Sequence, residues 1–334
     1  MALEPIGDIA NPTLTDLTAT DLTWDTASDW DNAVAETNVE HASNVISMLA
    51  SVLDDFEYLT DGEDASGQQG WTVNAGYADG DNGNTNFTTF TNGSINLRFD
   101  GGVNKGEIYK DLTPGQPDYI NIIVGVDGQS SNNPVYQGPG VQSTPAVLAE
   151  INTKDQGGAD DGDLIINGTT VITGSLGDGV EAEVELSNID WDAEEFDLIV
   201  DGGSEGTFSF FESVSEVDAY LLWTAGPEEG LLDDLTFEYR TATLTTATKS
   251  FNANQQPDLA NLSYVLDGEA ITVEVIGSPG TASEEIVSQS LDGSSSYSLT
   301  WSQGHQDFRV RVVFDRTVDA FNNNPTFSAV TLSA

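Results

Sequence analysis

From Phe56 onward, the chain is a succession of short segments in which apolar and polar residues alternate, separated by turns rich in Gly, Asn, Asp and Pro. Alternation with a period of two puts successive side chains on opposite faces and predicts β-strands. Frequent turns between short strands predict a mainly β fold made of sandwiches. We expect strands at 71–77, 87–90, 94–99, 106–112, 118–126, 146–152, 163–168, 180–187, 195–202, 206–211, 219–224 and 231–240.

These segments form a first block at 56–240, which we predict to be a jelly-roll-like β-sandwich. The block is long for one sandwich, so we interpret 127–145 as a loop insertion. Seven further strand segments follow in 241–334, and that number and length fit an immunoglobulin-like or fibronectin-like sandwich. The chain has no Cys, so the Cys-Trp-Cys pattern of true immunoglobulin domains is absent, and disulfides and thiolate catalysis are excluded.

The preceding residues, 1–55, have a different pattern. We predict an extended arm at 1–26 and a short helix at 28–38, with Ser28 as its cap. A second helix is predicted at 42–55, because Val45, Leu49 and Val52 recur at helical spacing and form one apolar stripe. This stripe packs either on the rest of the chain or on copies of itself in a homo-oligomer.

The charge of the chain restricts its solvent and its partners. There are 56 Asp and Glu against nine Lys and Arg, a formal net charge of −47, while apolar residues make up 38%. That apolar content argues against an acidic disordered chain. Repulsion is screened over roughly 10 Å at ~0.1 M salt but over roughly 3 Å at 1 M. We therefore predict a protein of very high salt, from a haloarchaeon or its virus, with K⁺ and Na⁺ as its surrounding ions. The same charge argues against nucleic acid and anionic membranes as partners.

Several features bear on location and catalysis. The sequence contains no stretch of eighteen apolar residues that could span a membrane. The N-terminus lacks the basic and apolar regions of a signal peptide. We find no hydrolase, phosphate-binding or dinucleotide-binding motif. His41 and His305 have no second metal ligand nearby in sequence, and we interpret them as helix-start and turn residues. We expect a protein that is not an enzyme.

Two loops are dense in oxygen ligands of the kind that calcium prefers. Neither has EF-hand spacing. Acidic surface loops are also common in a halophile, so the alternatives are a structural calcium site or a solvated loop. The candidate ligands are Asp79, Asp81, Asp160, Asp161 and Asp163.

Aromatic residues offer apolar platforms for sugars, and the Asn-rich loops offer amide hydrogen bonds. Trp71 and Trp223 are available, but our candidate glycan-binding residues are Trp191, Trp301 and Tyr77. Trp191 and Trp301 lie at predicted strand edges, where they could be exposed. The alternative for each ring is packing in the core.

Three of the nine cationic residues lie in QDFRVRVVFDR, 306–316. Alternation along this strand places Phe308 and Val310 toward the core and Arg309 and Arg311 outward. Glu274 faces outward on another predicted strand and could pair with one of these arginines. The alternative is a docking patch for an acidic partner or an anionic sugar.

Residues 231–334, from LDDLTFEY to NPTFSAVTL, resemble β-sandwich modules of tail-fibre and adhesin-like proteins of haloarchaeal tailed viruses. The stretch TWDTASDWDNAVAETNVEHASNV is similar to the leader of such proteins, and DDFEYLTDGEDASGQQGW through GEIYKDLTPGQPDYINIIVGV looks like a carbohydrate-binding jelly roll. The resemblance implies a virion surface protein, assembled in the host cytoplasm, whose residues 1–55 anchor it to other virion proteins. It transfers no binding residues.

We therefore expect a tail-fibre or baseplate-associated protein that attaches to a host surface glycan or S-layer glycoprotein, with several copies raising the avidity. One alternative is a capsid turret or decoration protein of the same virion. Another is a secreted carbohydrate-active enzyme or its binding module.

Overall fold

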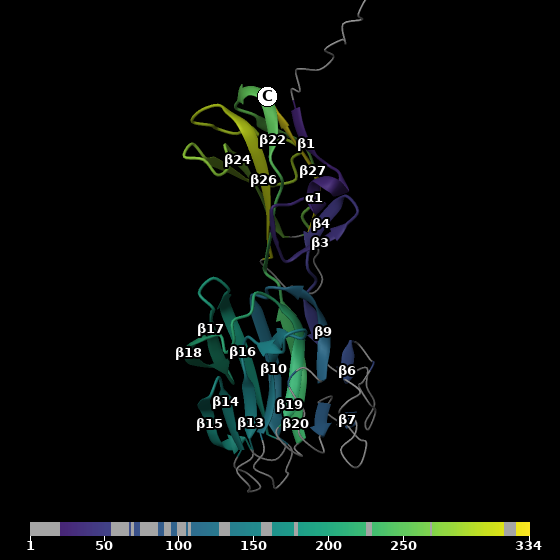
Figure 1. Ribbon diagram of the computed structural model, residues 1–334, viewed down its shortest axis with the longest axis vertical. Coiled ribbons are helices and arrows are strands. Elements are labelled where there is room, and N and C mark those ends of the chain that lie inside the picture. Colours follow the sequence, from purple (N-terminus) through teal and green to yellow (C-terminus); the bar gives the residue numbers. More distant parts are fainter. Residues whose placement is uncertain are drawn as a thin grey trace, which may run out of the picture. The chain divides into compact units, whose positions relative to one another are not determined.

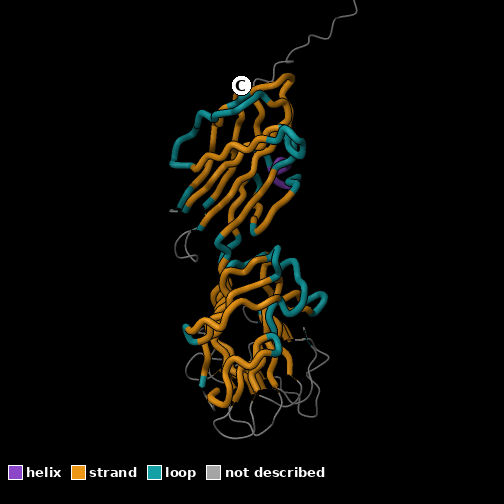
Figure 2. The backbone as a smooth tube through the Cα atoms, turned by 90° about the vertical axis from the view of Figure 1, so that its left-hand side faces the viewer, coloured by secondary structure: helices purple, strands orange, loops and turns teal. Residues whose placement is uncertain are grey.

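A computed structural model gives the fold, which is nearly all β (Figures 1 and 2). The chain divides into two compact units. Unit 1 comprises 1–47, 243–314 and 325–334, and unit 2 comprises 48–242 and 315–324. The structure describes residues 21–54, 67, 70–73, 86–89, 95–98, 105, 108–126, 134–154, 162–176, 180–224, 229–267, 269–316 and 325–334.

Unit 2 contains two antiparallel sheets. The first, called the β10 sheet, has the order β18 (Gly203–Ser209), β17 (Glu195–Val200), β16 (Glu181–Asp190), β10 (Tyr119–Val126), β20 (Glu229–Glu238), β8 (Ile95–Arg98) and β7 (Asn86–Thr89), and β5 (Val52–Asp54) also pairs with β20. The second, the β11 sheet, has the order β15 (Thr169–Leu176), β14 (Gly162–Ile166), β13 (Ile151–Lys154), β11 (Pro134–Val141), β19 (Val217–Thr224), β9 (Ile108–Gly115) and β6 (Trp71–Val73), and β12 (Ala146–Val147) also pairs with β11.

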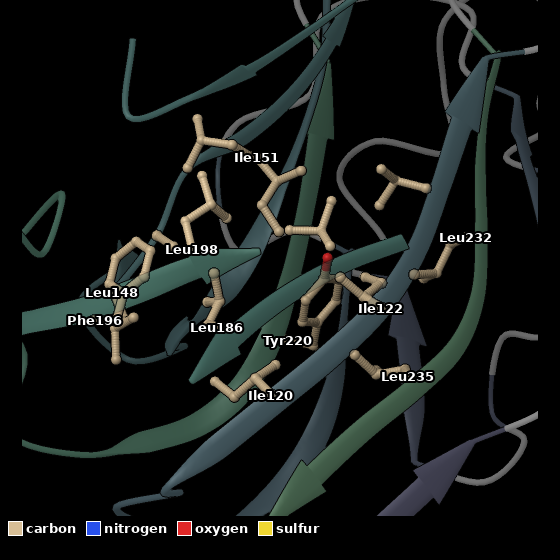
Figure 3. Close-up of a cluster of buried hydrophobic side chains, with 14 of the residues drawn as sticks. Ile120, Ile122, Leu148, Ile151, Leu186, Phe196, Leu198, Tyr220, Leu232 and Leu235 are labelled. Atoms are coloured by element: carbon tan, nitrogen blue, oxygen red, sulfur yellow. The ribbon is translucent and has the colours of Figure 1, made fainter. Parts of the chain in front are cut away.

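The core of unit 2 lies between these sheets. Alternate residues of β10, such as Ile120 and Ile122, point inward and are fully buried, as are Tyr220 and Leu222 of β19. Figure 3 shows side chains from both sheets pointing toward one another. The predicted alternation thus produces the β-sandwich that we expected.

Strand β11 falls within 127–145, where we expected a loop insertion, so that prediction is wrong. Pro139 and two glycines suggested a loop, yet β11 pairs with β19 from Val135 to Gly140. Pro139 is tolerated in β11 because the strand that pairs with β11 on the side away from β19 changes at this position. That neighbour is β13 up to Gln137 and β12 from Gly140 onward, so the missing N–H breaks no ladder bond.

Unit 1 is also a two-sheet sandwich. One sheet has the order β1 (Asp21–Trp24), β27 (Thr326–Ser333), β4 (Val45–Met48) and β3 (Val39–Ala42), and β23 (Asp258–Val265) also pairs with β27. The other has the order β2 (Ala35–Thr37), β21 (Thr241–Thr245), β26 (His305–Asp315), β24 (Ala270–Gly277) and β25 (Glu285–Ser290), and β22 (Lys249–Gln255) also pairs with β26. Residues 21–47 therefore contribute strands to both sheets of this unit.

The predicted helices are largely wrong. A single turn, α1 (Ala27–Asp31), replaces the helix expected at 28–38, and its cap is Thr26 with Asp29 completing a capping box. The segment 42–55 contains β4 and β5 instead of a helix. Short apolar runs do not distinguish helix from strand by periodicity alone, and here β27 and β20 supply pairing partners. No helix among the described residues is long and apolar enough to cross a membrane.

Candidate functional site

The face of the β11 sheet that points away from the core has a second group of apolar side chains. On β19, Tyr220 and Leu222 belong to the core, whereas Leu221 and Trp223 point the other way and pack with Val147. Two half-buried tyrosines pack against this group, Tyr109 from β9 and Tyr136 from β11. We use the name outer-face cluster for the following residues: Val147, Leu221, Trp223, Tyr109, Tyr136, Lys105, Glu150, Asn152, Phe211 and Glu212.

Aromatic rings form the centre of the outer-face cluster. Tyr136 lies opposite Trp223 in the register of β11 and β19, and their rings stack with centroids 5.6 Å apart and planes 7° apart. The Lys105 ammonium lies 5.1 Å from the centroid of Trp223 and 5.6 Å from that of Phe211. Phe211 is 41% exposed, so it offers an apolar surface to solvent beside the Lys105 ammonium.

Two carboxylates and one lysine border these rings. The Lys105 ammonium forms an ion pair of 2.6 Å with Glu212, whose Oε2 also accepts the Val147 N–H at 2.8 Å. Burial raises the pKa of Glu150, with Lys105 opposing that shift and Glu212 reinforcing it. The two carboxylates thus differ in environment: Glu212 is neutralised by a cation, and Glu150 is held toward its protonated form.

Asn152 adds an unused hydrogen-bonding group. It lies opposite Tyr136 in the register of β13 and β11, so its side chain is on the same face of the sheet. Asn152 is only 9% exposed, and among the described residues nothing donates to its Oδ1. A buried amide oxygen without a donor is costly unless a ligand or water satisfies it.

The connection 146–150 is held against the sheet by backbone bonds. The Leu148 N–H donates to Pro139 O, and the N–H groups of Phe211 and Glu212 donate to the carbonyls of Leu148 and Val147. Gly138 allows this close approach, because a Cβ there would lie 2.0 Å from the Ala149 carbonyl oxygen. These contacts fix the positions of both carboxylates relative to the rings.

The aromatic residues predicted to bind glycans lie elsewhere. Trp301 is 8% exposed, donates its indole N–H to Pro257 O at 2.8 Å and packs edge-on to Phe308, as the alternative of packing in the core predicted. Trp191 is half-buried, packs against the core of unit 2 beside Phe210 and donates to Pro117 O at 3.2 Å. Tyr77 lies outside the described residues.

The predicted calcium ligands are not tested by this structure. Of the candidates, Asp163 alone is described, and its Oδ1 accepts the Gly174 N–H at 2.9 Å. Within the described ranges, no group of three or more His, Asp or Glu could hold a metal ion. The others, which are Asp79, Asp81, Asp160 and Asp161, lie outside those ranges, and calcium binding there stays a prediction.

The arginine strand behaves as the pairing alternative predicted. Arg311 forms a 2.9 Å ion pair with Glu274 of β24, and its Nε donates to Thr245. Arg309 donates to the Thr248 hydroxyl at 2.9 Å. Arg316, at the end of the same stretch, is 5% exposed and donates to Ser51 and to Tyr239 O.

The apolar stripe that we predicted on a helix does not exist as one surface. Val45 is half-buried in β4, Leu49 is buried in the connection that follows, and Val52 is half-buried in β5 against the core of unit 2. These residues lie on two strands and their connection, so the helix that would have aligned them is wrong, and a contact of these residues with copies of the chain stays a prediction.

His305 was expected in a turn but begins β26 and is 2% exposed. Its Nδ1 lies 2.9 Å from Ser278 Oγ and its Nε2 lies 2.9 Å from Glu285 Oε2. This order of groups resembles a nucleophile–base–acid relay. However, the Ser278 N–H donates to Asp307 O, and Pro279 supplies no N–H for an oxyanion. We assign the network a structural role.

Comparison with known proteins gives matches among solved structures alone. No family model matches the chain, and no curated protein matches it significantly. A sialidase matches with 9% identity and a TM-score of 0.41 over 58% of this chain, and the chain spans 20% of that protein. A Bacillus licheniformis β-glucanase (12%, TM-score 0.36) and an endo-β-1,3-glucanase from Pyrococcus furiosus (12%, TM-score 0.37) match over 57% and 63% of this chain, and each is covered over 99% of its length.

These matches correct one prediction. We expected a protein that is not an enzyme, whereas the matched structures are named as a sialidase, glucanases and a laminarinase. That exclusion is wrong and is withdrawn. No residue role is transferred from these distant structures, so the outer-face cluster is judged on its own geometry.

Sequence reasoning missed most of this cluster. Trp223 was available as a platform, but Tyr136 lay in a presumed loop, and nothing singled out Glu150 or Glu212 among 56 acidic residues. One signal was present. Glu150 and Asn152 alternate in a predicted strand, which put them on a common face.

Proposed function

We propose that unit 2 binds a neutral glycan on the outer-face cluster. The observation that supports this most strongly is the combination of the exposed Phe211 and the half-buried Tyr136 with the unsatisfied Asn152 amide oxygen. Apolar faces of sugar rings pack on aromatic side chains, and their hydroxyls pair with carboxylates and amides. A few convergent polar groups beside an apolar surface are typical of small-molecule sites.

The charge of the site favours a neutral sugar over an anionic one. Lys105 is already paired with Glu212, and Glu150 adds a second carboxyl group. The chain as a whole has a net charge of −47, which repels a polyanionic glycan. The site offers no uncompensated cation among its described members.

The test is a glycan array in molar KCl followed by calorimetry on the strongest neutral ligand. Phe211→Ala and Asn152→Ala should each weaken binding about tenfold, which corresponds to ~1.4 kcal/mol. Ile286→Ala is the matched control, because Ile286 is 46% exposed but belongs to unit 1. Equal affinities of all three variants would refute glycan binding at this face.

Glycoside hydrolysis is a second candidate function, favoured by the differing environments of the two carboxylates. A carboxyl group with a raised pKa suits a general acid, and an ionised one suits a base or nucleophile. Glu150 and Glu212 fit these roles respectively. Hydrolysis of the bound glycan should then disappear in Glu150→Gln and Glu212→Gln, while binding of the glycan persists. Hydrolysis that survives in both variants would exclude this pair.

The sequence resemblance adds a proposal on location. We infer that the glycan-binding unit stands on the surface of a haloarchaeal virion as a tail-fibre or baseplate component, with a turret or decoration protein as the alternative. Averaged electron microscopy of the intact particle, with the protein labelled, tests both. A label absent from the particle would refute both.

A further inference from the structure

A lysine and an aspartate meet inside the sandwich of unit 2, away from the outer-face cluster. Lys110 lies on β9 of the β11 sheet, and Asp54 lies on β5, which pairs with the β10 sheet. Lys110 Nζ is 2.7 Å from Asp54 Oδ2, and the two side chains are 7% and 2% exposed. This contact therefore joins the two sheets through their interior.

An indole ring completes this arrangement. Trp71 is fully buried, and its Nε1–H donates to the same Asp54 Oδ2 at 3.1 Å. The Lys110 ammonium also lies 5.7 Å from the centroid of the Trp71 ring. Asp54 Oδ2 thus accepts hydrogen bonds from both the Lys110 ammonium and the Trp71 indole N–H.

The burial of this pair is unlike that of the other described lysine pairs. Lys105 and Glu212 are 19% and 39% exposed, and Lys249 and Asp29 are 33% and 13% exposed. Water stabilises the charges of those pairs. Two full charges buried together lose that hydration, and attraction between them often fails to offset the loss. Conversion of the two charged side chains to one neutral group removes this desolvation penalty.

We propose that Lys110 and Asp54 are joined by an isopeptide bond between Nζ and Cγ. A proton passes from the ammonium to the carboxylate, which gives a neutral amine beside a neutral acid. Nζ then attacks Cγ, and the Trp71 indole N–H stabilises the negative charge that develops on Oδ2, as oxyanion donors do in acyl transfer.

The step balances without any co-reactant. The N–C bond forms, the bond between Cγ and Oδ1 breaks, and Oδ1 leaves as water with two of the three ammonium protons. The third stays on the amide nitrogen. Neither partner is oxidised or reduced. The product is a secondary amide whose carbonyl oxygen keeps the Trp71 hydrogen bond.

Such a bond would serve the role that disulfides have in other chains. This sequence has no Cys, so it lacks that means of cross-linking. Closing the loop between residues 56 apart in sequence reduces the entropy of the unfolded chain. It also ties a short strand of one sheet to the opposite sheet, so unit 2 resists local opening there.

Mass spectrometry of the full chain, folded in molar KCl and then denatured, tests the proposal. The wild-type chain should be lighter than its sequence by one water molecule, whereas Lys110→Arg and Asp54→Ala should have their full sequence masses. Digestion should yield a branched peptide that joins Lys110 to Asp54. Lys105→Arg is the matched control. It should keep the mass loss, because the Lys105–Glu212 pair is more exposed and is not expected to form the bond.

Two outcomes would overturn the proposal. One is a wild-type chain of full mass that a lysine-specific protease cleaves after Lys110. The other is a loss of water without the branched peptide, since cyclisation of an aspartate elsewhere has the same mass. Because the wild-type mass decides the question, failure of a variant to fold leaves the test intact.

Discussion

Replacing Gly138 by alanine tests how the outer-face cluster is built. The connection 146–150 lies directly on β11, and a Cβ at Gly138 would be 2.0 Å from the Ala149 carbonyl oxygen, where contacts under 3.0 Å essentially never occur. The obstacle is backbone that is itself bonded to Pro139 and to 211–212, so it cannot move alone. The methyl group therefore displaces the whole connection.

The magnitude follows from two opposing effects. Overpacking of this kind costs about 3 kcal/mol at the upper end of its usual range. Alanine regains roughly 0.5–1 kcal/mol relative to glycine inside a strand. The expected net loss is about 2 kcal/mol, which lowers the melting temperature of a domain of this size by roughly 4–8 °C.

Differential scanning calorimetry in molar KCl measures this loss. Gly203→Ala is the matched control, because Gly203 is exposed in β18 and a Cβ there would lie 3.2 Å from the Val200 carbonyl oxygen. Gly138→Ala should also weaken glycan binding, since 146–150 positions Glu150. If Gly138→Ala melted together with Gly203→Ala and bound glycan normally, the close packing argued here would be refuted.

Three further predictions follow from charge. The chain should lose structure on dialysis below ~0.5 M KCl, where screening weakens, and a melting temperature independent of KCl by circular dichroism would contradict this. The hydrogen bond from His305 and the Ser302 N–H lower the pKa of Glu285 to about 2 from 4.5. Because the folded pKa is depressed, the stabilisation is present above pH 4.5 and is lost as pH falls toward 2. Glu285→Gln should therefore flatten the acid limb of unfolding free energy against pH, measured in denaturant titrations, and unchanged slopes would count against the network. Reversing Arg309 and Arg311 to Glu should remove a surface pair of about 1 kcal/mol or less and leave the oligomeric state unchanged in light scattering, whereas altered assembly would favour a docking patch instead.

The sequence predicted best where one pattern determined one outcome. Alternation marked β10, β16 and β26 and the side of β26 that faces the core, since Phe308 and Val310 are fully buried. It also predicted the pairing of Arg311 with Glu274. The local period of two was sufficient for the strands and their buried faces, whereas the pair with Glu274 also required β24 to lie beside β26.

Prediction failed where the deciding contact is distant in sequence. The glycines of β11 resembled a loop, yet they are needed because 146–150 passes over that strand. Segment 42–55 had helical spacing, but β27 and β20 pair with its two halves. Likewise, Tyr136 and Trp223 meet because β11 and β19 are neighbours, and no local pattern specifies that order.

The scarcity of cations gives the positions of the remaining ones physical meaning. Seven of the nine have a specific described contact with a carboxylate, hydroxyl, carbonyl or aromatic ring, and these are Lys105, Lys110, Arg240, Lys249, Arg309, Arg311 and Arg316. Arg240, for example, lies 4.9 Å from the centroid of the Tyr119 ring and pairs with Glu238. At the high salt that we predict for this chain, an acidic surface needs no counter-charge for solubility, because salt provides the screening. A cation is then kept where it holds a particular side chain, and on this argument the place of Lys105, between Glu212 and the rings of Trp223 and Phe211, marks the outer-face cluster as a built arrangement.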